Sequence, residues 1–331
     1  MRAQASALLR ALSRPALSSR NSNRFYATQT PNPDPSTPTV GLSDPNGYCR
    51  DLVRKHDYES YLISQFWPKD LQEAYFGIKA FSVELATVQD HVSNTMIGKM
   101  RMQFWRDAIK DIFNGRPPRH PIALALYEAT QRANLQPYHF KRIIDARDTE
   151  LETASYQTTD LLTSHAESTS STLLYLLLSL LPAPLSTSHA LSHAASHLGT
   201  AQTITTLLRA LPFHTRQGRS VIPAEITLRH SVRQEEVVRR GPEAQGIEDA
   251  VFEFATLAND HMITARSMLK EEGMGGKVPS DAMPIFLAGV PVTNLLQRLE
   301  KNGFNVFDPK LPLRDWKLPW QVYRGYYQRQ F

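Results

Sequence analysis

Apolar residues recur at steps of three and four positions along most of the chain from residue 48 onward, the spacing that buries one face of an α-helix. The clearest run is Leu71, Tyr75, Ile78, Phe81, Leu85, Val88 and Val92. Pro68 lies just ahead of this run and suits the first turn of a helix, where its missing N–H costs nothing. A second helix is predicted from about Thr95 to Phe113, because Asn114-Gly115 and Pro117-Pro118 then end it.

Similar patterns predict further helices, and no segment shows the alternation that is typical of a β-strand. The predicted ranges are 121–133, 137–152, 158–181, 187–211, 232–239, 246–271 and 290–302. The apolar run 173–185 contains Ser179 and is broken by Pro182 and Pro184. It is shorter than the roughly 20 residues that span a membrane, so we interpret it as a buried core helix and its end. The pattern predicts one all-α domain over residues 48–310.

The first 33 residues have a different composition, with five arginines, many Ser and Ala residues and no acid. This composition is typical of a mitochondrial transit peptide. The segment Arg24-Phe25-Tyr26-Ala27 resembles a matrix-protease cleavage site, so we predict a transit peptide over 1–26. Residues 27–47, rich in Pro, Thr, Asn and Asp, are predicted to form a disordered linker. The alternative for the N-terminal segment is a disordered basic tail.

The charge of the chain depends on this segment. The full sequence has a net charge of +5 and a pI of about 9.2. Five of the 37 basic residues and none of the 32 acidic residues lie in 1–26, so the remainder carries 32 of each. The net positive charge comes from the predicted transit peptide, so it is poor evidence for a nucleic-acid partner. The one cysteine, Cys49, excludes an internal disulfide and a cysteine-based zinc site.

Several motifs occur in the order found in the squalene/phytoene synthase family. The segment 77–90 resembles its first signature, in which an Ala-Phe pair precedes an acidic D-D-x-x-D cluster on one helix. Further similar pieces are Trp105 with Gly115 and His120-Pro121, Tyr156 with Asp160-Leu161, Leu198–Arg209, Ile222–Glu225 and Gly303–Phe307. This resemblance implies a single-domain, isoprenoid-synthase-like helical bundle.

The enzymes of that family ionise prenyl diphosphates, and Mg²⁺ ions bridge the phosphates to carboxylates on two helices. Mg²⁺ is a hard cation that prefers oxygen ligands, and it stabilises the leaving group. The five matching clamp positions of this chain are Ala86, Thr87 and Asp90 on the first helix and Ala210 and His214 on the second. Only Asp90 offers a carboxylate. The family's Gln and Asn on the second helix correspond to Thr203 and Thr206, and a late Tyr corresponds to Val292. We therefore predict no synthase activity, no metal and no cofactor.

A degenerate branch of this family carries further motifs that this chain shares. They are the segments 81–90 (F-x-V-E-L-A-x-V-x-D), 100–105 (M-R-M-Q-F-W) and 208–214 (L-R-A-x-P-F-H). Members of this branch help to assemble respiratory complex I (NADH:ubiquinone oxidoreductase). The resemblance implies a non-catalytic assembly factor on the matrix side of the mitochondrial inner membrane, with assembly intermediates or other assembly factors as partners. The alternatives are a prenyl diphosphate transferase with an active or reorganised site and an isoprenoid- or lipid-binding protein.

A glutamate on one predicted helix and a row of histidines on another could each have either a structural or a functional role. Glu84 lies among apolar residues on a predicted helix, where a carboxylate needs a partner; Lys79 and Arg101 are the basic candidates for an ion pair, and a retained ligand contact is the alternative. His189, His193 and His197 follow one another at four-residue steps, which could chelate zinc. We favour a solvated or partly packed histidine face, because no Asp or Glu lies between residues 168 and 224 to support a metal.

The tail, residues 311–331, combines basic and aromatic side chains. Such a combination suits an anionic membrane interface or a protein partner, and it also occurs in segments that pack on their own domain or bind single-stranded nucleic acid. We expect a membrane or partner contact and no nucleic acid. The candidate contact residues are Trp316, Lys317, Trp320, Tyr323, Arg324, Tyr326 and Tyr327.

Overall fold

The computed structural model describes residues 41–92, 94–153, 155–271 and 275–331. Within these ranges there are helices and no strands, so the all-α fold class is confirmed. The α-helices are α1 (Pro45–His56), α2 (Tyr58–Ile63), α3 (Lys69–His91), α4 (Thr95–Phe113), α5 (Pro121–Arg132), α6 (Pro137–Glu150), α7 (Thr159–Ala166), α8 (Thr172–Leu178), α9 (His189–Arg216), α10 (Ala224–Arg229), α11 (Gln234–Arg240), α12 (Ile247–Glu271), α13 (Met283–Phe286), α14 (Gly289–Lys301) and α15 (Leu318–Gln328). The predicted transit peptide lies outside the described residues.

Helix ends follow local capping chemistry. Helix α4 has the predicted bounds because the Asn94 side chain accepts a 2.8 Å hydrogen bond from the Met96 N–H and Gly115 adopts a positive φ just past the end. Pro68 precedes α3 as its N-cap and is not part of its first turn. The predicted end of α9 at residue 211 is wrong: the helix passes through Pro212, which cannot donate a backbone hydrogen bond, and ends at Arg216.

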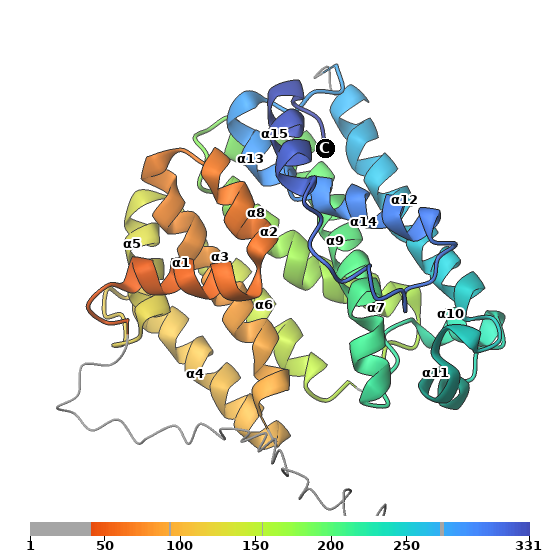
Figure 1. Ribbon diagram of the computed structural model, residues 1–331. Coiled ribbons are helices and arrows are strands. Elements are labelled where there is room, and N and C mark those ends of the chain that lie inside the picture. The colour runs from red at the N-terminus through yellow and green to blue at the C-terminus, as the bar shows by residue number, and fades with distance from the viewer. Residues whose placement is uncertain (1–40, 93, 154, 272–274) are drawn as a thin grey trace, which may run out of the picture. The chain divides into compact units, whose positions relative to one another are not determined.

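Three segments differ from the sequence pattern. The predicted helix 158–181 consists of α7, a π-helical segment (Glu167–Ser171) and α8, because α9 crosses closely at this point. Helix α1 begins at Pro45, inside the predicted linker, because Asp44 caps it by accepting from the Gly47 N–H. Residues 318–328 of the tail form α15, which Figure 1 places beside α13 and α14.

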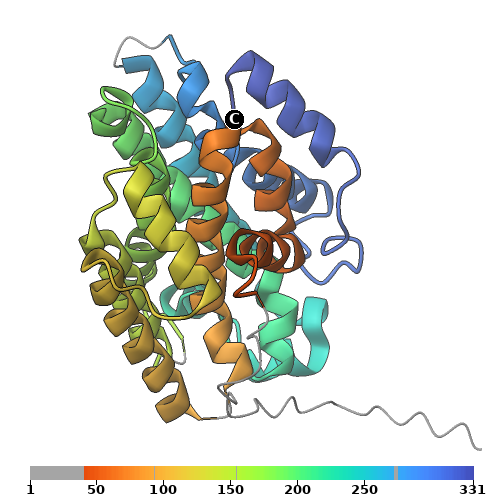
Figure 2. The ribbon, with the colours of Figure 1, turned by 90° about the vertical axis from the view of Figure 1, so that its left-hand side faces the viewer.

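Helix α9 runs through the middle of the bundle and joins two hydrophobic clusters. It makes its most extensive contact with α12 and also packs on the π segment and α8 (Figures 1 and 2). Its first half, including Leu198, belongs to a cluster with α1, α3, α4, α5 and α8. Its second half, including Leu208, belongs to a cluster with α10, α11 and α12. The second half carries two of the clamp positions.

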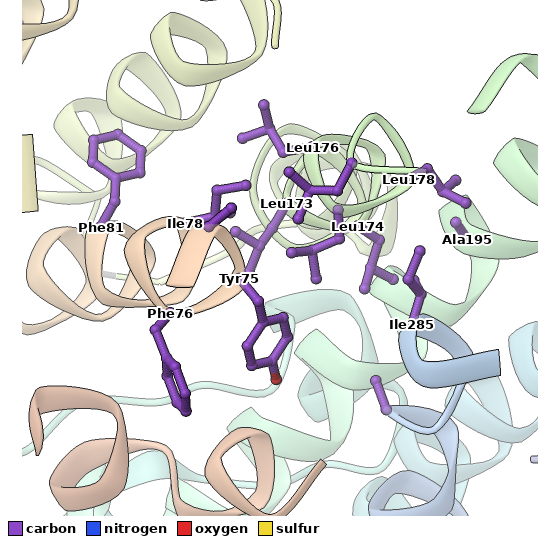
Figure 3. Close-up of a cluster of buried hydrophobic side chains, with 14 of the residues drawn as sticks. Tyr75, Phe76, Ile78, Phe81, Leu173, Leu174, Leu176, Leu178, Ala195 and Ile285 are labelled. Atoms are coloured by element: carbon purple, nitrogen blue, oxygen red, sulfur yellow. The ribbon is translucent and has the colours of Figure 1, made fainter. Parts of the chain in front are cut away.

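Leucines of α8 fill the interior between α3 and α13. Figure 3 shows Leu173, Leu174 and Leu176 in the space between Ile78 and Ile285, with Leu178 facing Ala195 of α9. The segment 173–181 is thus a buried core helix and its end, as predicted.

Candidate functional site

The α3 half of the predicted clamp lies in the last two turns of that helix. Ala86 and Asp90 are exposed, and Thr87 is half-buried. The Thr87 hydroxyl donates to the Val83 carbonyl of its own helix at 2.9 Å, so it is already occupied. Asp90 is the one carboxylate among the five clamp positions, and among the described residues it forms no ion pair.

The α9 half ends at His214, and the structure brings this residue close to Asp90. Burial lowers the pKa of His214, the Arg219 cation lowers it further, and the carboxylates of Asp90 and Glu150 oppose both effects. The imidazole is therefore neutral at neutral pH. Its Nδ1 is buried and has no hydrogen-bond partner among the described residues. A neutral imidazole beside one carboxylate is a poor magnesium site.

The last turn of α6 carries a largely buried ion pair that is close enough to His214 to influence its pKa. Arg147 Nη1 lies 2.6 Å from Glu150 Oε2, and both side chains are less than a quarter exposed. Burial alone would raise the pKa of Glu150, but Arg147, followed by His165, outweighs it and holds this pKa below its ordinary value. Glu150 therefore stays ionised, and its charge is matched inside the protein.

His165 and Tyr156 complete a buried polar cluster, which we define as Arg147, Glu150, Tyr156 and His165. His165 Nε2 lies 3.7 Å from Glu150 Oε1, yet burial lowers the pKa of His165 to about 4 and keeps the ring neutral at neutral pH. The Tyr156 ring lies against His165 with centroids 5.5 Å apart. Burial, and then the Glu150 carboxylate, raises the pKa of Tyr156, so its phenol is also neutral.

The sequence pattern did not point to Arg147, Glu150 or His165. An Arg and a Glu three positions apart on a helix look like a solvated charged face. Only the fold shows that this face turns inward against α7 and α9.

Two threonines of α9 stand where the family places Gln and Asn. The Thr203 hydroxyl donates to Ser170 Oγ at 2.7 Å, and the Thr206 hydroxyl donates to the Gln202 carbonyl of its own helix. Gly199 allows α9 to approach the π segment, because a Cβ at this position would lie 2.5 Å from the Ser171 backbone nitrogen. Thr203 and Gly199 therefore hold α9 against the π segment, whereas Thr206 bonds only within its own helix. Val292 is buried in α14.

The predicted ion pair of Glu84 with Lys79 or Arg101 is wrong, because neither forms an ion pair with it among the described residues. Lys79 is buried, and its Nζ lies 3.8 Å from Asp57 Oδ2 at the start of α2. Burial raises the pKa of Glu84, while Arg101 and then His91 oppose the shift from beyond ion-pair distance. Asp57 precedes Lys79 by 22 positions, so a local sequence pattern cannot predict that the start of α2 lies against α3.

The histidine stripe of α9 continues onto α12. The rings of His189, His193 and His197 follow one another with centroids 5.0 and 6.0 Å apart, and His197 Nδ1 lies 2.9 Å from His261 Nδ1. Burial lowers the pKa of His197 and of His261, so one neutral ring can donate to the other. Among the described residues, no three His, Cys, Asp or Glu side chains are arranged to hold a metal ion.

Helix α15 has two apolar faces. Leu318, Val322 and Gly325 are buried, and Asn294 of α14 bonds to both Asp315 and Gln321. Exposed aromatic residues form an aromatic stripe, which we define as Trp316, just before the helix, and Trp320, Tyr323 and Tyr327 of α15; these side chains are 49–76% exposed. Tyr326 is half-buried against Phe66 with ring centroids 5.0 Å apart, and Lys317 lies over the Trp316 ring. The exposed basic residues Lys317 and Arg324 flank the stripe.

No helix in the described ranges is both long enough and apolar enough to cross a bilayer. Four pockets among the described residues have linings that include none of the clamp positions, and one of them, lined by Leu211 and Thr215, lies beside the end of α9.

The helices form an isoprenoid-synthase-like bundle. Over 86% of this chain and 95% of the other, they match the crystal structure of a dehydrosqualene synthase with a TM-score of 0.72 at 16% identity. The model of the squalene/phytoene synthase family matches residues 53–323, and the chain belongs to this family.

Two curated relatives represent different branches. "NADH dehydrogenase (ubiquinone) complex I, assembly factor 6" of Rattus norvegicus is 38% identical over 292 residues, which cover 88% of this chain and 84% of the relative. The phytoene synthase of Arthrospira platensis is 21% identical over 285 residues, which cover 83% of this chain and 90% of the synthase. The chain is thus more similar to the protein named an assembly factor than to the enzyme.

Proposed function

We propose that this chain is a non-catalytic assembly factor for mitochondrial complex I that uses the synthase bundle as a scaffold. The observation that carries the proposal is the state of the five clamp positions, which together supply one carboxylate. Beneath them, the buried polar cluster pairs its own charges. The assembly-factor name of the 38% identical relative supports the same function.

The physical requirement for catalysis is severe. Mg²⁺ keeps several waters and needs carboxylates to hold it against a prenyl diphosphate. Asp90 is the one clamp carboxylate, His214 is neutral, and Ala86 and Ala210 carry no oxygen in their side chains. The nearby Glu150 is committed to Arg147 at 2.6 Å. The site therefore lacks the ligand set that would stabilise a leaving diphosphate.

A gene knockout tests the biological role. We expect it to lower complex I selectively, measured as NADH:ubiquinone oxidoreductase activity and as assembled complex on native gels. Re-expression of the chain should restore both, while the activities of the other respiratory complexes serve as the control. Normal complex I in a clean knockout would contradict the proposal.

An enzyme assay separates this role from the two alternatives. Purified protein is incubated with farnesyl or geranylgeranyl diphosphate and Mg²⁺, and diphosphate release is measured. We expect no release above the buffer background. Diphosphate release by the wild-type chain that is lost in the Asp90→Ala variant would show that the protein is a prenyl diphosphate transferase instead. Bound isoprenoid or lipid in native mass spectra would favour a binding protein, against which the leucine-filled interior argues.

The proposed location is the matrix side of the inner membrane. Residues 1–26 fused to a fluorescent protein should direct it to mitochondria, and replacing their five arginines with glutamine should abolish import. A cytosolic fusion with the unaltered segment would contradict the proposed address.

We assign membrane contact to the aromatic stripe of α15. Tryptophan and tyrosine prefer the depth of lipid headgroups, and the flanking Lys317 and Arg324 complement anionic lipid. The buried face of α15 packs on α14. The aromatic stripe can therefore contact a membrane without a further loss of conformational entropy to order the helix. The charge favours lipid over an apolar protein groove.

Vesicle flotation tests this contact. The triple substitution of Trp316, Trp320 and Tyr323 by Ala should reduce binding to vesicles with anionic cardiolipin at least tenfold. Phe252, Leu228 and Ile263 are similarly exposed on α12 and α10, and their triple replacement by Ala is the matched control. Equal loss in both variants, or equal binding of the wild-type chain to purely zwitterionic vesicles, would contradict the assignment.

A further inference from the structure

A cavity of about 100 Å³ lies beside the last turn of α9, on the side that faces α10 and α11. Its wall is largely apolar, with Leu211, Ile222, Val237 and Ile247 all at least nine-tenths buried. These side chains belong to the second hydrophobic cluster, so the floor of the cavity is part of the rigid core.

The rim of the cavity is polar and carries one charge. Arg219, in the loop after α9, lines it together with hydroxyl groups of Ser155, Thr215 and Ser220. Arg219 donates to the Gln217 side-chain oxygen, but in the described part of the chain no carboxylate pairs with its guanidinium. Thr215 is buried, and its hydroxyl has no hydrogen bond among the described residues. A cation with free donors above an apolar floor is complementary to a carboxylate with a short hydrocarbon chain.

We propose that this cavity, the α9 pocket, binds a short-chain monocarboxylate whose carboxylate pairs with Arg219 and whose hydrocarbon chain enters between Leu211, Val237 and Ile247. The volume sets the length: it equals about three water molecules, which leaves room for a chain of about three carbons. The site is separate from the clamp positions, and the proposal does not depend on the assembly role.

Methyl NMR on the full-length chain tests this site, with butyrate as the probe. Selectively labelled Ile, Leu and Val methyl groups report binding, and we expect saturable shifts centred on Leu211, Ile222, Val237 and Ile247. Butyramide has the same shape without the charge, and acetate has the charge without the chain. Both should bind at least tenfold more weakly than butyrate.

Two substitutions and one matched control locate the ligand. Arg219→Gln removes the cation, Val237→Phe fills the cavity, and each should weaken butyrate binding at least tenfold. Arg216→Gln changes an exposed arginine on the last turn of α9 outside the lining, and it should bind like the wild-type chain. The methyl spectrum of each variant shows directly whether it is folded.

A second measurement uses His214, whose pKa Arg219 helps to lower. A carboxylate bound to Arg219 offsets that cation, so butyrate should raise the pKa of His214 in the wild-type chain and not in Arg219→Gln. Absence of saturable shifts, shifts centred on other methyl groups, or equal affinity for butyramide would overturn the proposal.

Discussion

The leucine interior around α8 and the buried polar cluster near His214, here called the polar end, exclude a ligand in different ways. In the interior, aliphatic side chains of α8 occupy the space between α3, α9 and α13. At the polar end, charges remain but are matched within the protein, as in the 2.6 Å pair of Arg147 and Glu150. Aliphatic side chains fill the first region, and oppositely charged side chains pair with each other in the second.

Under the proposed non-catalytic function, these two regions are where the bundle would differ from an enzyme of this kind. An enzyme of this kind must keep an open apolar channel and unpaired carboxylates, and both reduce stability. Here both regions are arranged as ordinary core. Each region should therefore stabilise the fold in the way its chemistry implies.

The largest effect is expected in the leucine interior. Leu176 is fully buried, so Leu176→Ala leaves a cavity and should lower the free energy of unfolding by about 4 kcal/mol. Urea denaturation followed by circular dichroism measures the change. Leu228, which is 76% exposed on α10, is the matched control, and its replacement by Ala should have almost no effect. Similar costs at the two positions would show that the interior is loosely packed.

The polar end should respond nearly as strongly when its pairing is broken. Glu150→Ala leaves Arg147 buried without its counter-charge, which should cost about 3 kcal/mol in the same denaturation experiment. Glu235 pairs with Arg239 on exposed α11, and Glu235→Ala should cost about 0.3 kcal/mol. A cost for Glu150→Ala as small as that of the control would mean that water reaches the cluster.

The contact between α9 and the π segment lies between the two regions. Gly199→Ala places a Cβ 2.5 Å from the Ser171 backbone, and the forced separation should cost about 2 kcal/mol. Gly77 in α3 is the control, because an added Cβ there meets Ala125 at 3.4 Å and its replacement by Ala should change stability by less than about 1 kcal/mol. Thermal unfolding of the two variants provides the comparison.

The buried polar cluster also predicts a pH dependence. Burial lowers the pKa of His165 from 6.5 to about 4, so the unfolded chain binds this proton more tightly. The corresponding stability is complete above about pH 6.5 and is lost as the pH falls toward 4. Between about pH 7.5 and about pH 5 the loss from this group should be about 2 kcal/mol. His165→Gln should remove this loss, so the free energy of unfolding of the variant should fall less over the same pH range. An unchanged pH dependence would contradict a buried neutral His165.

Much of the fold follows from patterns that are local in sequence. Asn94 and Gly115 mark both ends of α4, and apolar residues three and four apart mark most other helices. The π segment could not be predicted, because the close crossing at Gly199 that accompanies it involves residues far apart in the chain. Helix α15 was not predicted, because its apolar and aromatic residues lie on both the buried and the exposed face and so do not form one apolar stripe.

The sequence motifs name some residues of the candidate site. Asp90 and His214 come from these motifs, and in the structure the Asp90 carboxylate is close enough to act on the pKa of His214. Their surroundings could not be predicted, because the burial of Arg147 and Glu150 depends on how α6 meets α7 and α9. The pairing of Lys79 with Asp57 was missed for the same reason, because it depends on how the start of α2 meets α3.

The central claim is that this bundle supports complex I without chemistry at the clamp. Complementation of the knockout with Asp90→Ala tests it most directly, because this substitution removes the one clamp carboxylate from an exposed position. We predict that NADH:ubiquinone oxidoreductase activity returns to the level reached with the unaltered chain at equal protein abundance. Failure of Asp90→Ala to restore complex I, while the protein accumulates normally, would contradict the account.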